Sequence, residues 1–115
     1  MFALSKLLIG GALLAAFHHG WAHYDTERAF TLEGTIGEVD YVNPHVFVRV
    51  EPEDDSSGSW LAVLAPPSRM TRRGLPADSV RVGVTARLYG YPHKETPREM
   101  RAERITIGTR TTELR

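Results

Sequence analysis

The sequence contains no cysteine among its 115 residues. This absence excludes disulfide bonds, thiolate nucleophiles, cysteine-based zinc sites and blue-copper centres, which all need a sulfur ligand. The sequence also lacks a Gly-x-Ser-x-Gly elbow, a phosphate-cradling glycine loop and a dinucleotide-binding fingerprint. We therefore expect a protein that is not an enzyme and that acts by binding.

The first 22 residues have the three-part pattern of a secretory signal. A basic start that ends at Lys6 precedes an apolar run over residues 7–17, and small residues follow, up to Ala22. We expect residues 1–22 to be a signal peptide that is cleaved after Ala22, so that the protein is exported to the periplasm. The alternative is an uncleaved leader that anchors the protein to a membrane, facing the periplasm, with Trp21 at the interface.

Removal of the leader leaves enough chain for one small domain, over residues 23–108, and a polar tail over 109–115. Charge is unevenly distributed along it. Residues 23–67 hold two basic and nine acidic side chains, whereas residues 68–115 hold eleven basic and five acidic ones. Such asymmetry is typical of a nucleic-acid or membrane face, or of acidic strands that lie beside basic strands. Because exported proteins rarely meet nucleic acid, we expect the second arrangement and no nucleic-acid partner.

The chain after the leader alternates between apolar and polar residues, as short strands do. At Gly37 the apolar positions change parity, which predicts a bulge or bend in the first strand. Pro67 and Gly74 are a suitable first residue and terminator for a short helical turn over residues 68–73. The five expected strands cover residues 29–37, 45–51, 60–65, 84–91 and 99–107.

Five strands with a helical insert between the third and fourth fit the small five-stranded Greek-key barrel called the OB-fold. The predicted fold class is therefore all-β, an OB-like barrel preceded by the hydrophobic leader helix. A small β-sandwich is the alternative architecture. We expect the polar tail over residues 109–115 to be frayed.

Four short motifs, separated by strands, point to a known group of proteins. They are Tyr-Asp at 24–25 after His23, Thr-Leu-Glu-Gly-Thr at 31–35, Asn-Pro-His at 43–45 and Met-Thr-Arg-Arg-Gly at 70–74. In this order they resemble a family of small exported bacterial domains of unknown function. The resemblance implies export and a small β-barrel, and it implies no activity. Relatives often start with two histidines followed by Ser-Phe, where this chain has one histidine and then Tyr24.

Three histidines of the expected mature domain are candidate metal ligands. Cleavage after Ala22 would give His23 a free α-amine beside its imidazole, which together form a chelating pair for copper. His45, at the start of the second strand, would complete the set, and His93 in the loop after the fourth strand is a weaker candidate. The alternative is that His45 caps a turn and that His93 is a solvated loop residue.

Two further groups of side chains have both a binding and a structural interpretation. Arg72 and Arg73 at the end of the helical turn suit an anion or a partner's carboxylate, or they offset the helix dipole. Trp60, Tyr89 and Tyr91 suit an aromatic platform, or they pack across neighbouring strands.

Two functions follow from these observations. The first is an exported binding module that carries copper or another transition metal. The second is an accessory or assembly subunit that docks on a larger membrane or periplasmic complex, anchored by an uncleaved leader.

Overall fold

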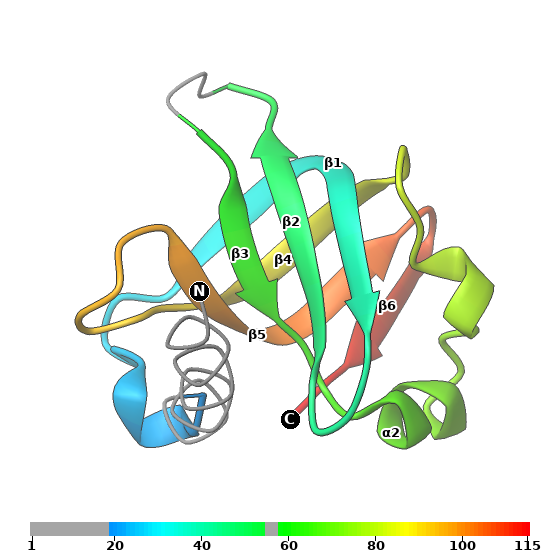
Figure 1. Cartoon of the computed structure of the whole chain (residues 1–115), viewed down its shortest axis with the longest axis horizontal. Helices are drawn as coiled ribbons and strands as arrows, with labels where there is room; N and C mark the ends of the chain where they lie inside the picture. Colours follow the sequence, from blue (N-terminus) through cyan, green and yellow to red (C-terminus); the bar gives the residue numbers. More distant parts are fainter. Residues whose placement is uncertain (1–18, 55–57) are drawn as a thin grey trace, which may run out of the picture.

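The computed structural model describes residues 19–54 and 58–115 of the chain (Figure 1). The described part is mostly β-strand, as predicted. The elements, in chain order, are η1 (Trp21–His23), β1 (Phe30–Tyr41), β2 (Val46–Pro52), β3 (Trp60–Val63), α2 (Pro67–Arg72), η2 (Ala77–Ser79), β4 (Thr85–Pro92), β5 (Glu99–Ile107) and β6 (Arg110–Glu113).

The strands form one sheet in the order β3-β2-β1-β4-β5-β6, and a parallel pairing of β3 with β5 closes five of them into a barrel. Every other neighbouring pair is antiparallel. The helical segments α2 and η2 lie between β3 and β4. This connectivity confirms the predicted OB-like barrel with a helical insert.

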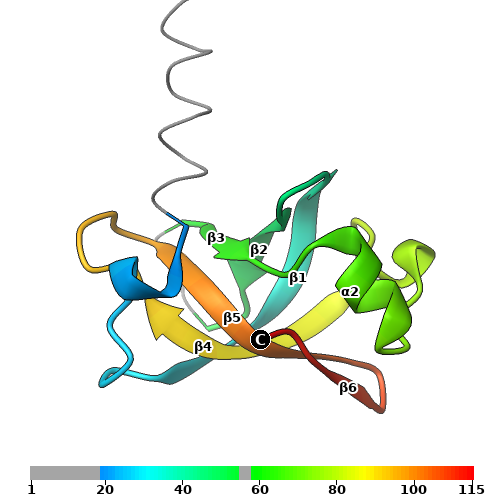
Figure 2. The ribbon, with the colours of Figure 1, turned by 90° about the horizontal axis from the view of Figure 1, so that it is seen from below.

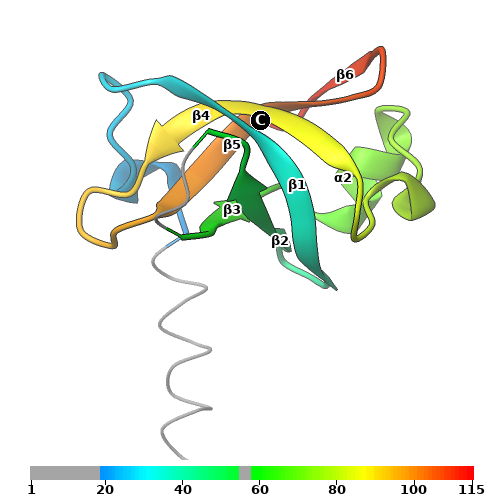
Figure 3. The same cartoon turned by 90° about the horizontal axis from the view of Figure 1, so that it is seen from above.

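Strand β1 takes part in both halves of the barrel, and it curves across the molecule between them (Figure 3). Its first half pairs with β4 and its second half with β2. The register with β2 shifts between Ile36 and Glu38, so the bulge that the parity change at Gly37 predicts is confirmed. The extra residue bends the strand, which allows one strand to serve two sheet directions.

The close approach of the β1 and β2 backbones depends on Gly34. A Cβ atom at this position would lie 2.1 Å from the carbonyl oxygen of Glu51. Only glycine lets the two backbones approach so closely.

The core is apolar and lies inside the barrel. Alternate residues of β2 point inward, as the pattern predicts: Val46, Val48 and Val50 are each at most 1% exposed. Helix α2 contributes Met70, whose side chain is fully buried in the same cluster. The insert therefore closes one end of the barrel with a side chain that the strands do not supply.

The end of the chain differs from the sequence prediction. Residues 110–113 form β6 on the free edge of β5, where a frayed tail was expected, and Leu114 is buried at 1% exposure. Two arginines of the insert hold this end: Arg69 donates to the carbonyl of Leu114, and Arg73 to those of Glu113 and Arg115. These contacts are long-range, so the polar composition of the tail did not indicate them.

Residues 19–24 lie at the end of the barrel opposite α2 and η2 (Figure 2). They are the described part of the predicted leader and its junction, because residues 1–18 fall outside the described ranges. Within residues 19–54 and 58–115, no helix is long and apolar enough to cross a membrane.

Candidate functional site

Four of the five histidines in the sequence lie in two neighbouring pairs. The ring centres of His19 and His45 are 6.1 Å apart, and those of His23 and His93 are 6.2 Å apart. Tyr24 joins the two pairs, since its ring lies 4.9 Å from that of His93 and its hydroxyl lies 3.1 Å from Nδ1 of His19. The fifth histidine lies outside the described residues.

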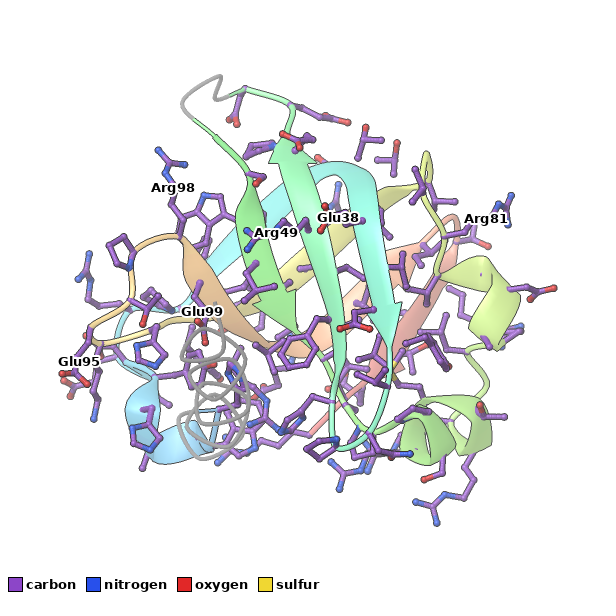
Figure 4. All side chains as sticks on the ribbon, viewed as in Figure 1. Glu38, Arg49, Arg81, Glu95, Arg98 and Glu99 are labelled. Atoms are coloured by element: carbon purple, nitrogen blue, oxygen red, sulfur yellow. The ribbon has the colours of Figure 1, made fainter. Side chains whose placement is uncertain are left out.

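A buried triangle of polar groups lies at the centre of this cluster. The hydroxyl of Tyr24 donates to Oε2 of Glu99 at 2.5 Å, and Nδ1 of His19 lies 3.1 Å from the same oxygen. A carboxylate can only accept, and the hydroxyl proton of Tyr24 already points at it, so Nδ1 of His19 must carry the other hydrogen. In the neutral ring, the lone pair of His19 is therefore on Nε2. Glu99 begins β5 at this end of the barrel, beside the loop that holds Glu95 and Arg98 (Figure 4).

The environment of the triangle keeps Glu99 ionised and Tyr24 protonated. Burial pushes the pKa of Glu99 upward, but the hydrogen bonds from His19 and Tyr24 outweigh it, so the pKa ends below its ordinary value. Burial, and then the hydrogen bond to Glu99 and its negative charge, raise the pKa of Tyr24 far above 10. A tyrosine that holds its proton so firmly is a poor nucleophile, and the triangle is suited to orient His19.

Arg101 fastens the segment before β1 to β5. Its guanidinium donates to the carbonyl oxygen of His19 and lies 4.2 Å from the ring centre of Trp21. Arg115 lies 4.4 Å from the same ring, so two cations contact one indole. Burial lowers the pKa of Arg101 to about 10, which leaves it charged at neutral pH.

His45 is arranged as a neutral imidazole. Its Nδ1 lies 3.2 Å from the carbonyl oxygen of Leu64, and a carbonyl only accepts, so Nδ1 carries the hydrogen and Nε2 the lone pair. Burial, and then the charge of Arg101, lower the pKa of His45 below 6.5. Its ring also contacts Phe47, with centres 6.4 Å apart. An oriented imidazole with Nε2 unprotonated is the form that binds a metal ion.

His93 has the opposite arrangement. Its Nδ1 accepts hydrogen bonds from the backbone N–H groups of Glu95 at 3.1 Å and of Thr96 at 3.0 Å. In the neutral ring the hydrogen must therefore be on Nε2, so neither nitrogen offers a lone pair without disturbing the loop. His93 is 9% exposed and is thus not the solvated loop residue of the alternative interpretation.

The predicted ligands fall into two different pairs, and one of these pairs includes His19, which is not a predicted ligand. His23 faces His93, and His45 faces His19. In the uncut chain the backbone N–H of His23 donates to the carbonyl of Gly20, so the proposed chelating amine exists only after cleavage. His19 was not a candidate because it falls inside the predicted leader. Across the described ranges, no group of three or more His, Asp or Glu side chains is placed to hold a metal ion.

A groove of about 290 Å³ opens beside His19 on the outer surface of β1, β2 and β3. Glu38 and Asp40 line it from β1 and Arg49 from β2, and Glu38 and Arg49 lie close on the same face (Figure 4). Phe47, Val48 and Leu61 complete its lining. The groove therefore connects solvent to His19, which is itself only 5% exposed.

Arg73 and the aromatic candidates have structural partners. Arg73 binds the chain end as described above, whereas Arg72 is exposed on α2. Trp60 packs against Phe30, with ring centres 5.0 Å apart. Tyr89 and Tyr91 pack against each other at 6.1 Å, so the three aromatic side chains are divided between two contacts.

In the described part of the chain, an ion pair links the acidic half to the basic half across neighbouring strands. Arg87 of β4 lies opposite Glu33 of β1, with Nη2 and Oε2 3.2 Å apart. This pair fits the expectation that acidic strands lie beside basic ones.

Comparison with known proteins identifies a family and no activity. Residues 7–101 match DUF6152, a family of unknown function, which confirms the resemblance that the sequence motifs indicate. No curated protein matches the chain.

Solved structures share the fold, among them three of TiaS. The complex of TiaS with its tRNA and ATP aligns with a TM-score of 0.52 and 22% identity over 80% of this chain and 20% of its own. A ZRD-deleted mutant of TiaS in complex with agmatine aligns with a TM-score of 0.56 and 20% identity over 78% of this chain and 27% of its own. Apo TiaS, a tRNA agmatidine synthetase, aligns with a TM-score of 0.50 and 20% identity over 74% of this chain and 19% of its own. This chain thus spans about a quarter or less of each, and the likeness extends to the fold alone.

Proposed function

We propose that this chain, which belongs to the DUF6152 family of unknown function, is a small exported binding module that holds a transition-metal ion through His45. The observation that carries the proposal is the hydrogen bond between Nδ1 of His45 and the carbonyl of Leu64, at 3.2 Å. It orients the ring and leaves Nε2 as the donor atom, as outer-shell carbonyls do in metal sites.

Copper is the first candidate for the ion. Imidazole nitrogen suits copper, zinc and nickel, and among divalent first-row metals such sites bind copper most tightly. The lack of cysteine removes the thiolates that would favour other centres. The lowered pKa of His45 supports binding at neutral pH, because no proton has to leave the ring first.

The module acts by binding and not by catalysis in this proposal. Tyr24 and Glu99 are buried polar groups that contact His19, and they hold each other in fixed protonation states. No nucleic-acid partner is part of the proposal, since the groove holds two acidic side chains, Glu38 and Asp40, against one basic side chain, Arg49.

The test is metal titration of the full chain as it is produced in a bacterium. Its intact mass is measured first, and native mass spectrometry then follows addition of copper(II) or zinc(II) chloride. We expect one ion per chain. The variant His45→Asn keeps an N–H donor near the Nδ1 position but has no equivalent of Nε2, so it should lose tight binding without loss of fold. Unchanged affinity in this variant would refute the proposal.

A second candidate function, an accessory subunit of a membrane or periplasmic complex, is supported by the packing of Trp21. Arg101 and Arg115 hold this residue against the barrel, so the sequence that precedes it is joined to the barrel at a defined point. A leader that is kept would then anchor the barrel to a membrane. Affinity purification of the full chain from its native membranes tests this candidate: a stoichiometric protein partner is expected, and a lone monomer contradicts it.

A further inference from the structure

We infer that His19 is the second ligand of the ion that His45 holds, and that Glu99 is the carboxylate that orients it. This inference rests on the proposed function and extends it to a residue that the sequence places inside the leader. His19 comes from the segment before η1, His45 directly precedes β2, and Glu99 begins β5.

The first argument is the arrangement of donor atoms. Both imidazoles use Nδ1 for a hydrogen bond to an oxygen that only accepts: Glu99 for His19 and the carbonyl of Leu64 for His45. Each neutral ring therefore keeps its lone pair on Nε2. His93 lacks this arrangement because its Nδ1 accepts two backbone hydrogen bonds.

The second argument is distance. Metal–nitrogen bonds of about 2.0–2.1 Å at each ring keep two ring centres roughly 5–6.5 Å apart. The centres of His19 and His45 are 6.1 Å apart, so a small local adjustment suffices to bind one ion between them. Phe47 packs against both rings, with centres 5.1 Å from His19 and 6.4 Å from His45, and restricts their movement.

The third argument is the carboxylate behind His19. A carboxylate that accepts the distal N–H of a metal-bound histidine sets its tautomer and raises its basicity. Glu99 has this position at 3.1 Å, and Tyr24 in turn donates to Glu99 at 2.5 Å. The site therefore has an outer shell on both ligands, one carboxylate and one carbonyl.

The groove supplies a route for the ion. It opens at His19, and its lining holds two acidic side chains, Glu38 and Asp40, against one basic side chain, Arg49, so the net negative charge favours cations. Two protein ligands leave coordination positions open to water or to a ligand from a partner. Such an incomplete set suits an ion that is passed on.

The inference has a consequence for export. Cleavage after Ala22 would separate His19 from the barrel, together with the contacts of Trp21 and of the His19 carbonyl. A functional site with His19 therefore needs a chain in which residues 19–22 stay attached, either with the whole leader or after a cut before His19.

The experiment compares matched asparagine variants of the full chain, extracted in mild detergent, with copper(II) chloride as the probe. His19→Asn keeps an N–H donor near Nδ1 for Glu99 and lacks Nε2, as His45→Asn does for Leu64. His23→Ala, a change at a neighbouring histidine, is the control. The readouts are the dissociation constant, the number of coupled nitrogens in the electron paramagnetic resonance spectrum, and the thermal midpoint of the metal-free protein.

We expect both asparagine variants to bind copper at least tenfold more weakly and to show one coupled nitrogen where the unmodified protein shows two. The double variant should show no coupled nitrogen and bind more weakly than either single variant, but by less than the sum of the two single losses, because both residues serve one site. Glu99→Gln should weaken binding by about 10–100-fold. His23→Ala should bind as the unmodified protein does, and the metal-free asparagine variants should keep its thermal midpoint.

The outcomes separate the two proposals. If His45→Asn loses binding while His19→Asn keeps it, the module binds metal but the pairing with His19 is refuted. The pairing is also refuted if the exported chain starts at His23 and still binds through His45. If neither asparagine variant changes the affinity, both proposals fail.

Discussion

Nδ1 of His19 lies 3.1 Å from Oε2 of Glu99, and 80 residues of sequence separate the two. Both side chains are buried, at 5% and 7% exposure. Removal of one partner of such a buried polar pair strongly destabilises the fold, because the other polar group stays buried without its hydrogen-bond partner. Residues 19–22, which precede the predicted cleavage position, are therefore part of the folded domain in the uncut chain.

The stability of the metal-free protein should fall in acid because of Glu99. His19, Tyr24 and His93 face this carboxylate, and its folded pKa is lower than its unfolded pKa near 4.5. A group of this kind stabilises the fold fully above the unfolded pKa, and the contribution is lost as the pH falls through the folded pKa. Thermal midpoints measured from pH 6 to pH 3 should drop more for the unmodified protein than for Glu99→Gln. Parallel curves would contradict the prediction.

Trp21 should contribute to stability although it lies in the predicted leader. Trp21→Ala removes the ring that contacts the guanidinium groups of Arg101 and Arg115, and each cation–π contact contributes about 0.5–2 kcal/mol. We expect the free energy of unfolding of the uncut chain to decrease by about 1–3 kcal/mol in urea titration. Trp21→Phe, which keeps an aromatic face, should retain part of this stabilisation. A chain cut after Ala22 that is as stable as the uncut one would show that this packing is dispensable.

Two glycines of β1 should differ sharply in their tolerance of alanine. Gly34→Ala would push a methyl group to 2.1 Å from the backbone oxygen of Glu51, so we expect destabilisation of at least about 1–3 kcal/mol. At Gly37, in the bulge, the nearest atom to an added Cβ is a flexible side-chain oxygen of Glu51 at 3.4 Å. Gly37→Ala should therefore melt close to the unmodified protein. Equal effects at both positions would be inconsistent with the close approach of the β1 and β2 backbones at Gly34.

Alanine substitutions of Arg72 and of Arg73 should differ in their effect on the stability of the chain end. Arg73 donates to the carbonyl oxygens of Glu113 and Arg115, each at 2.8 Å, whereas Arg72 points to solvent from α2. In Arg73→Ala, we expect the amides of β6 to exchange hydrogen faster while β1 and β2 keep their protection. Arg72→Ala serves as the control and should leave exchange in β6 unchanged. Faster exchange in both variants would point to a general effect of lost positive charge.

Much of the barrel was predictable because its strands are local patterns. Alternation over residues 45–51 places Val46, Val48 and Val50 on the inner face, and the structure buries all three. The parity change at Gly37 is also local, and it marks the register shift in β1. The sequence does not predict β6 because its four residues are all polar. Its stability comes from pairing with β5 and from the burial of Leu114.

The candidate site was predictable only in part. His45 follows a turn signal and has a donor arrangement suited to metal binding, but nothing local to His45 indicates His19 as its neighbour. His93 reads as an exposed loop residue, yet the folded loop buries it and uses its Nδ1 as an acceptor.

The sequence by itself determined the all-β class, the position of the bulge and the inward faces of the strands, because each depends on the order of apolar and polar residues within a few positions. It also determined which donor atoms are absent, since a chain without cysteine has no thiolate. Only the tertiary structure decided which histidines meet and which of their nitrogens carries a lone pair. Those properties depend on hydrogen-bond partners such as Glu99 and Leu64, which the closure of the barrel brings to His19 and His45.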